Sequence, residues 1–246
     1  MWTRAQLKQN GLFHFKKNYW MCVLAALLLM LVGGVMAGGG GINFNFNGSD
    51  FEAELQEAVE EAPDTFGATM ALVGGILAIV FLIIGVFGIL LSIFVFKPLE
   101  VGGKRFFVAN HYQEKTELGE LAFGFKANYG NVVKTMFLKN LFVFLWSLLF
   151  VIPGIVKMYA YRMVPYLLTE HPDMDANEAL TLSQNMMNGQ KMNAFVLDLS
   201  FIGWEILSAI TFGLVGIFYV NPYKAATDTE LYIALKETGA GGYMQQ

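Results

Sequence analysis

Residues 68–96 read ATMALVGGILAIVFLIIGVFGILLSIFVF and contain no charged side chain. About 20 helical residues cross a hydrocarbon core of about 30 Å, so this run is long enough to span a bilayer. A second uncharged run covers residues 19–37. Of the 246 residues, 55% are apolar and only 15% are charged, against about 25% charged residues in an average soluble domain. The sequence therefore predicts an all-α, polytopic membrane protein.

The charge balance and the cysteine content exclude other classes of protein. The 16 Lys and Arg residues against 20 Asp and Glu residues give a formal net charge of −4, so no basic surplus is available to neutralise a nucleic acid. Cys22 is the single cysteine, so an internal disulfide is excluded. The basic start of the chain leaves a cleaved signal peptide as an alternative, but the 19–37 run is longer than a usual signal core. We expect it to be a retained anchor.

The loops between the apolar runs predict an orientation. Residues 38–67 contain seven acidic residues and no Lys or Arg, whereas residues 1–18 contain basic residues and no acid. Residues 97–135 are also rich in Lys and Arg. Because basic residues in short loops stay in the cytoplasm, we expect residues 1–18 and 97–135 to be cytoplasmic and the acidic loop to be extracellular.

Two later stretches allow either four or six membrane helices. Residues 137–168 form either one kinked helix or two helices that turn at Pro153-Gly154. Residues 194–220 form either one helix or a hairpin that turns at Thr211-Phe212-Gly213. Acidic residues outnumber basic ones in residues 169–193, which by itself favours an outside loop there and four helices.

An internal repeat favours six helices. Residues 15–20 (FKKNYW) resemble residues 125–130 (FKANYG), and each stretch lies just before a long apolar run. Residues 175–189 form a third amphipathic stretch before an apolar run. Helix-capping patterns open the first and third copies at Thr3 and Asp175. A proline follows each pair of apolar stretches, at Pro98, Pro165 and Pro222.

The predicted architecture is therefore three pseudo-repeated hairpins, each preceded by an interfacial amphipathic helix, with both termini in the cytoplasm. The predicted segments are a cytoplasmic amphipathic segment at 1–18, membrane helices at 19–37, 68–96, 136–152, 155–168, 193–210 and 214–235, an extracellular acidic loop at 38–67, a cytoplasmic segment at 97–135 and an amphipathic linker at 169–192.

The C-terminal half, over about residues 130–236, resembles a known family. The sequences that carry the resemblance include Ile152-Pro153-Gly154, Pro165-Tyr166, residues 195–204 (FVLDLSFIGW) and residues 220–223 (VNPY). They are similar to the bacterial integral membrane family called domain of unknown function 975. The linker before residues 195–204 is usually basic in that family and is neutral here. The resemblance implies a multi-pass protein of the bacterial cytoplasmic membrane, and it supplies no catalytic residues because the family has none assigned.

Four ionisable residues stand out in the later predicted membrane helices, namely Lys157, Arg162, Asp198 and Glu205. Such side chains are costly in a membrane and are often functional. Matching depths along antiparallel helices predict ion pairs between Arg162 and Asp198 and between Lys157 and Glu205. These residues form either a proton or ion relay, or a polar substrate path, or fixed ion pairs that select helix neighbours. We favour the fixed pairs, because an unpaired buried charge is worse than a paired one.

A second candidate site is the acidic face of a predicted helix in the extracellular loop. Asp50, Glu54, Glu57 and Glu61 lie on this face. It either binds a basic membrane-protein partner or divalent cations, or is simply a solvated face. Helical carboxylates lack the oxygen geometry of a dedicated calcium loop, and charge runs are usually solvated.

Catalytic motifs are not recognisable in the sequence. The three histidines, His14, His111 and His171, are far apart and none has a His-Glu-x-x-His setting. Asp173 and Asp175 beside His171 are interpreted as a turn and a helix cap rather than as metal ligands. We therefore expect no enzyme activity, no metal and no cofactor.

The function expected from the sequence is that of a non-enzymatic scaffold or accessory component of a membrane process. Its expected partners are the lipid bilayer and a membrane protein that binds the acidic outer helix, and no nucleic acid. The alternative is a small-molecule or ion transporter or channel that uses the buried charges. A third hypothesis, an intramembrane enzyme, has no visible pair of nucleophile and base in its support.

Overall fold

The computed structural model describes residues 2–33 and 64–238, and their regular secondary structure is entirely helical. The chain divides into two compact units. One contains residues up to Val32 and from Ile93 onward, and the other contains residues 33–92. In the second unit, the described structure is the apolar helix α4 (Asp64–Leu91) with the start of the π-helical turn η1 (Ser92–Phe96). The all-helical prediction is confirmed for the described residues.

Three described helices are long and apolar enough to cross a membrane, as judged by length and composition. They are Val73–Tyr112, Tyr129–Leu149 and Lys191–Ile210, and a shorter apolar helix covers Tyr19–Met30. The predicted segment 155–168 is split between two short helices, and the segment 214–235 is largely a polar helix. The arrangement of six membrane helices as three repeats therefore stays a prediction.

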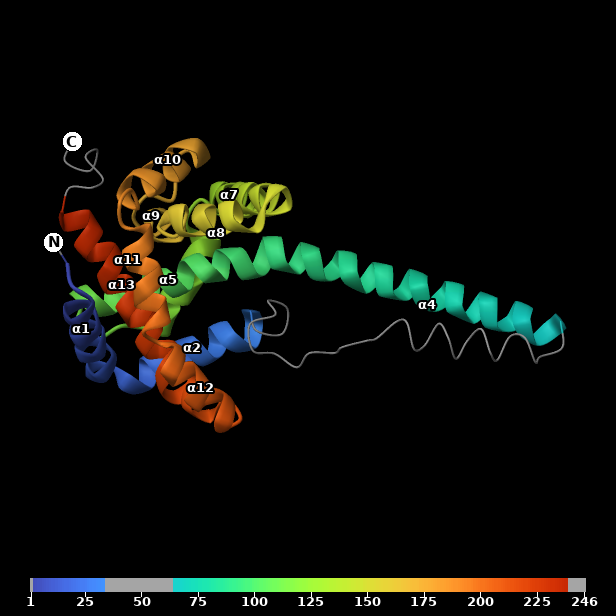
Figure 1. The fold of residues 1–246 in the computed structure, drawn as a ribbon, viewed down its shortest axis with the longest axis horizontal. Helices are drawn as coiled ribbons and strands as arrows, with labels where there is room; N and C mark the ends of the chain where they lie inside the picture. The colour runs from blue at the N-terminus through green and yellow to red at the C-terminus, as the bar shows by residue number, and fades with distance from the viewer. Residues whose placement is uncertain (1, 34–63, 239–246) are drawn as a thin grey trace. The chain divides into compact units, whose positions relative to one another are not determined.

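Residues 129–160 form a helical hairpin. Helices α7 (Tyr129–Leu149) and α8 (Val151–Ala160) pack against each other and are joined at Phe150, whose backbone is extended (Figure 1). Gly154 faces Ser147 so closely that a Cβ at position 154 would overlap the Ser147 Oγ. The sequence predicts that residues 137–168 form either one kinked helix or two helices that turn at Pro153-Gly154. The two-helix alternative is correct, but the turn is at Phe150 rather than at Pro153. Pro153 lies in the first turn of α8, where no helical N–H is required.

A second hairpin occupies residues 191–220. Helices α11 (Lys191–Leu199) and α12 (Ile202–Ile210) are followed by a turn and by η3 (Gly216–Val220), which packs against α12. Phe212 (φ 51°) and Gly213 (φ 82°) both adopt a left-handed conformation in the turn. The predicted turn at residues 211–213 is confirmed. Phe212 stands at its tip with 98% of its surface exposed.

The remaining helices form a compact group that we call the helical body. It consists of α1 (Arg4–Lys17), α5 (Lys97–Tyr112), α9 (Val164–Glu170), α10 (Ala176–Met186) and α13 (Asn221–Glu237). Helix α13 packs along α1 and also contacts α5, which in turn contacts α9 (Figure 1). Smaller elements complete the unit: α2 (Tyr19–Gly33), η2 (Leu118–Ala122) and α6 (Phe123–Lys126).

The starts of these helices follow from the sequence. Helices α5, α9 and α13 each have a proline in the first turn, where its missing N–H costs nothing. Thr3 caps α1 by accepting a hydrogen bond from the backbone N–H of Gln6 at 3.3 Å. Asp175 caps α10 by accepting one from Asn177 at 2.9 Å. The two predicted helix caps are thus confirmed.

Helices α1 and α13 are in close contact at Gly11. A Cβ at this position would lie 2.8 Å from the backbone N and Cα of Thr227. Real Cβ atoms do not approach a backbone that closely, so this packing requires glycine. The core beside it is filled by large buried side chains, which include Phe15, Phe106, Met163, Tyr166, Phe201 and Tyr232.

Candidate functional site

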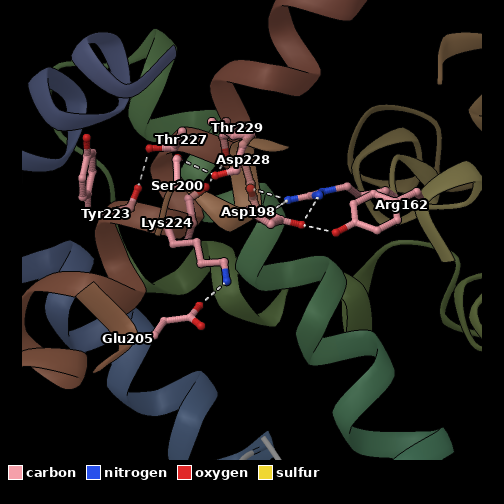
Figure 2. A network of polar contacts seen from close by, with 12 residues as sticks. Arg162, Asp198, Ser200, Glu205, Tyr223, Lys224, Thr227, Asp228 and Thr229 are labelled. Atoms are coloured by element: carbon pink, nitrogen blue, oxygen red, sulfur yellow. Dashed lines mark hydrogen bonds and ion pairs between the residues drawn. The ribbon is translucent and has the colours of Figure 1, made fainter. Parts of the chain in front are cut away.

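Arg162, one of the predicted site residues, lies in the turn between α8 and α9 at the centre of a cluster of charged groups. Its Nη1 and Nη2 each donate to one carboxylate oxygen of Asp198 on α11, both at 2.8 Å. Nη2 also donates to Asp228 Oδ1 on α13 at 2.7 Å (Figure 2). The Tyr159 hydroxyl donates to Asp198 Oδ2 at 2.7 Å. We call these four residues the Arg162 network.

The Arg162 network joins three separate parts of the chain. The side chains of Arg162 and Asp228 are each 16% exposed and that of Asp198 is 25% exposed, so all three ion-pair members are largely shielded from solvent. The bidentate contact with Asp198 fixes the orientation of the guanidinium plane as well as its position. Removal of the arginine would leave two carboxylates without their cation.

A serine from α10 positions Arg162. The helical hydrogen-bond pattern breaks after Ala160, and the Ser183 Oγ donates to the freed Ala160 carbonyl at 2.8 Å. The same oxygen accepts a hydrogen bond from the backbone N–H of Met163 at 3.2 Å. Ser183 is fully buried. It therefore satisfies both sides of the break and holds the turn that carries Arg162.

The structure brings together one of the two expected ion pairs. Arg162 and Asp198 are in contact, but the expected pair of Lys157 and Glu205 is wrong. The Lys157 Nζ donates to Gln184 Oε1 at 3.0 Å, and Glu205 instead forms an ion pair with Lys224 at 2.6 Å (Figure 2). Pairing by depth requires straight helices, whereas both segments break, after Ala160 and after Leu199.

Lys224 and Asp228 are not among the predicted site residues, although the sequence carries a signal for them. Both lie in the predicted membrane segment 214–235, so the rule that selected Arg162 and Asp198 applies to them equally. They are four residues apart and therefore lie on one face of α13. This face meets Glu205 and Arg162.

A lysine from α1 supports the break between α11 and α12. The Lys8 Nζ donates to the Ser200 carbonyl at 3.0 Å and lies 4.2 Å from the centroid of the Phe201 ring. Both contacts favour the charged ammonium. The N-terminal helix therefore helps to fix the segment that presents Asp198.

The second candidate site is the acidic face of the predicted extracellular helix. Asp50, Glu54, Glu57 and Glu61, the predicted acidic face, lie outside the described residues.

The acidic residues near His171 have ordinary structural partners. Glu170 forms an ion pair with Lys236 at 2.8 Å. Asp175 caps α10, and the backbone N–H of Asn177 that donates to its carboxylate holds the pKa of Asp175 below its usual value. His171 is exposed. The interpretation of this segment as a turn and a helix cap is thus confirmed at Asp175.

Residues 2–33 and 64–238 thus form an all-helical structure, and three of their helices are long and apolar enough to cross a membrane. Residues 151–239, which contain the whole Arg162 network, match the family model described as "Protein of unknown function (DUF975)". The resemblance noted in the sequence is confirmed over these residues. Comparisons with curated proteins and with solved structures gave no match.

Proposed function

We propose that this chain is a non-enzymatic, multi-pass protein of the bacterial cytoplasmic membrane, and that it acts as a scaffold or accessory component of a membrane process. The observation that carries the proposal is the closed form of the Arg162 network. One guanidinium binds both carboxylates, and Tyr159 occupies a further acceptor site on Asp198. Arginine does not release its proton in proteins, so a relay through this group is disfavoured. A fixed connection between helices fits the geometry better.

The exposed surface of the hairpins supports a membrane location. Leu148 and Ile152 at the tip of the α7–α8 hairpin are each 75% exposed, and Phe212 at the tip of the second hairpin is almost fully exposed. Contiguous apolar surface of this kind is unfavourable in water and is ordinary against lipid tails. The hairpins are therefore the proposed membrane anchors of this unit.

The contacts within the helical body support a cytoplasmic linker at residues 169–192, which the six-helix topology requires and the four-helix alternative excludes. Helix α5 belongs to the predicted cytoplasmic segment 97–135, and α9 packs against it. In the four-helix alternative, the chain from α9 to α10 would lie on the opposite side of the membrane from α5. The packing of α1 on α13 likewise supports the placement of both termini on the cytoplasmic side. The acidic loop 38–67 is then the proposed contact for an extracellular partner.

Reporter fusions test this topology. A fluorescent protein that matures only in the cytoplasm and an alkaline phosphatase that is active only outside are each fused after Gly189. We expect fluorescence and no phosphatase activity. Fusions after residue 63 serve as the matched outside control and should give the opposite result. Phosphatase activity after Gly189 would overturn the six-helix topology.

A transport assay separates the scaffold from its alternative. The full chain is reconstituted into liposomes, and the decay of imposed proton, sodium and potassium gradients is followed with ion-sensitive dyes. We expect the decay to match that of liposomes without protein. A flux that wild-type protein supports and Asp198→Asn abolishes, with Arg4→Met as an unaffected control, would favour the transporter and contradict our proposal.

A further inference from the structure

Three helices of the helical body bring two histidines and a glutamate together. His14 lies on α1, His111 on α5 and Glu230 on α13. The Glu230 Oε1 is 2.6 Å from His111 Nδ1 and 3.8 Å from His14 Nε2. The two imidazole rings lie with their centroids 4.4 Å apart. One potential metal-binding atom from each residue lies within 4.8 Å of the other two.

The environment of Glu230 is unusual for a buried carboxylate. The residue is 4% exposed, and burial of a carboxylate requires compensation by a cation or by several hydrogen bonds. Among the ion pairs of the described residues, those of Glu230 are both with imidazoles rather than with Lys or Arg. The Nδ1 of His14 is buried without a hydrogen-bond partner among the described residues. The cluster thus has a buried carboxylate whose ion pairs are with imidazoles and, within the part of the chain that the structure describes, a buried imidazole nitrogen without a hydrogen-bond partner.

We infer that His14, His111 and Glu230 bind a divalent transition-metal ion, with zinc as the best fit. Imidazole nitrogens and a carboxylate are the ligands that zinc takes at about 2.0–2.2 Å. In a tetrahedral site, those bond lengths place neighbouring ligand atoms about 3.4 Å apart. The observed distances of 2.6 and 3.8 Å from Glu230 fall on either side of this value. All three ligand atoms lie within 4.8 Å of one another, so no pair has to approach by more than about 1.4 Å to form the site.

A pocket beside the cluster provides room for a fourth ligand. The pocket has a volume of about 300 Å³, and its lining includes His111 and Glu230 together with Trp2, Gln6 and Asn10. Three protein ligands leave one position of a tetrahedral zinc ion open, and a water molecule in such a pocket can fill it. The side chains of His14 and His111 are 16% and 22% exposed, so the ion can reach the site from solvent.

The site would connect helices that are far apart in the sequence. A metal ion bound by α1, α5 and α13 closes a contact between the first and the last described helices. Because the unfolded chain does not hold these ligands together, binding of the metal stabilises the folded state by mass action. The proposed scaffold would then be more stable in the presence of zinc.

The direct test is a zinc titration of the full chain, purified in detergent with a tag that contains no histidine and stripped with a chelator. Binding is measured by competition with a chromophoric zinc chelator, and cobalt is used as a spectroscopic probe of coordination geometry. We expect one zinc ion per chain and the visible absorption bands of tetrahedral cobalt. Zinc should also raise the melting temperature of the protein.

The variants His14→Asn, His111→Asn and Glu230→Gln identify the ligands. Loss of a group that merely orients a ligand commonly costs about 10–100-fold in metal affinity, so loss of a ligand should cost at least that much. His171→Asn is the matched control, since it removes the exposed histidine outside the cluster, and it should bind zinc as the wild type does.

Two outcomes would overturn the metal site. The first is that the stripped wild-type chain binds no zinc and gains no thermal stability from it. The second is that the three variants, with melting temperatures in chelator that match the wild type, bind zinc with wild-type affinity. A variant that melts at a lower temperature in chelator does not identify a ligand by its affinity alone. In that case the cobalt spectrum of the wild type decides whether the site exists, because tetrahedral coordination by nitrogen and oxygen has a characteristic absorption that octahedral surface binding lacks. An octahedral spectrum contradicts the site.

Discussion

In the α7–α8 hairpin, Leu148 and Ile152 are each 75% exposed, whereas in the helical body Phe106, Tyr166 and Tyr232 are buried. The two regions belong to one unit, yet they place their apolar side chains in opposite ways. The helical body buries them against one another and adds ion pairs and hydrogen bonds between helices. The hairpin leaves its apolar side chains exposed, which suits a surface in contact with lipid tails. Substitutions should therefore act on folding in the helical body and on membrane insertion in the hairpins.

The largest expected effect is in the Arg162 network. Arg162→Met leaves Asp198 and Asp228 partly buried without their cation, and the removal of one member of such a group costs about 3–5 kcal/mol. The free energy of unfolding, measured by denaturant titration in detergent, should fall by this amount. Arg4→Met, which removes an exposed arginine, should change it by less than about 0.5 kcal/mol.

A triple variant sharpens this result. Arg162→Met combined with Asp198→Asn and Asp228→Asn removes the uncompensated charges, and it should regain most of the stability lost in the single variant. Stability that stays at the level of the single variant would show that the network does more than balance charge between helices.

The next effect concerns insertion of the hairpin. Phe144 is exposed on α7, and an arginine near the centre of a membrane helix costs about 2.5–3.5 kcal/mol. Phe144→Arg should therefore reduce the fraction of chains that resist alkaline extraction from membranes. Its unfolding free energy in detergent should change by less than about 0.5 kcal/mol. Phe144→Leu is the control, and an equal loss of extraction resistance in it would contradict the membrane role of α7.

A pair of glycine substitutions compares the two regions directly. Gly11→Leu places a side chain against the backbone of Thr227 and should destabilise the helical body by about 1–3 kcal/mol. Gly203 on α12 has open space around it, so Gly203→Leu should leave stability unchanged or raise it by less than about 1 kcal/mol. Thermal melts of the two variants, side by side, measure the difference. Equal melting temperatures would disprove the close packing of α1 on α13.

The smallest effect is expected at Lys8. Lys8→Met removes the hydrogen bond to the Ser200 carbonyl and the contact with the Phe201 ring, which together are worth about 1 kcal/mol. Lys16→Met removes an exposed lysine of the same helix and serves as the control. Chemical denaturation resolves this difference, and indistinguishable midpoints for the two variants would mean that Lys8 contributes nothing to the break after Leu199.

The sequence predicted the features that depend on local chemistry. The apolar runs identified helices, and the Thr211-Phe212-Gly213 turn was recognisable because glycine favours the left-handed conformation that the turn adopts. The contact of Arg162 with Asp198 followed from similar depths. By contrast, the turn at Phe150 has no turn residue, and Pro153 acts as a helix starter after it.

The features that the sequence did not predict depend on packing between distant segments. The cluster of His14, His111 and Glu230 combines residues from three helices, and no local spacing joins them. Lys224 is the partner of Glu205 because η3, which leads into α13, packs against α12. The segments predicted as straight helices are also broken, at the ends of α8 and α11. Straight-helix geometry therefore gave the wrong partner for Lys157.

The contacts that α13 makes with Arg162 and with α1 have a consequence for the synthesis of the protein. Asp228 follows Arg162 by 66 residues. Since ribosomes add about 5–20 residues per second, Asp228 is synthesised about 3–13 s after Arg162. Helix α1 is synthesised long before α13, which packs against it. The helical body can close only after α13 has been synthesised, and a chain truncated before α13 would present Gly11 without Thr227 and Arg162 without Asp228.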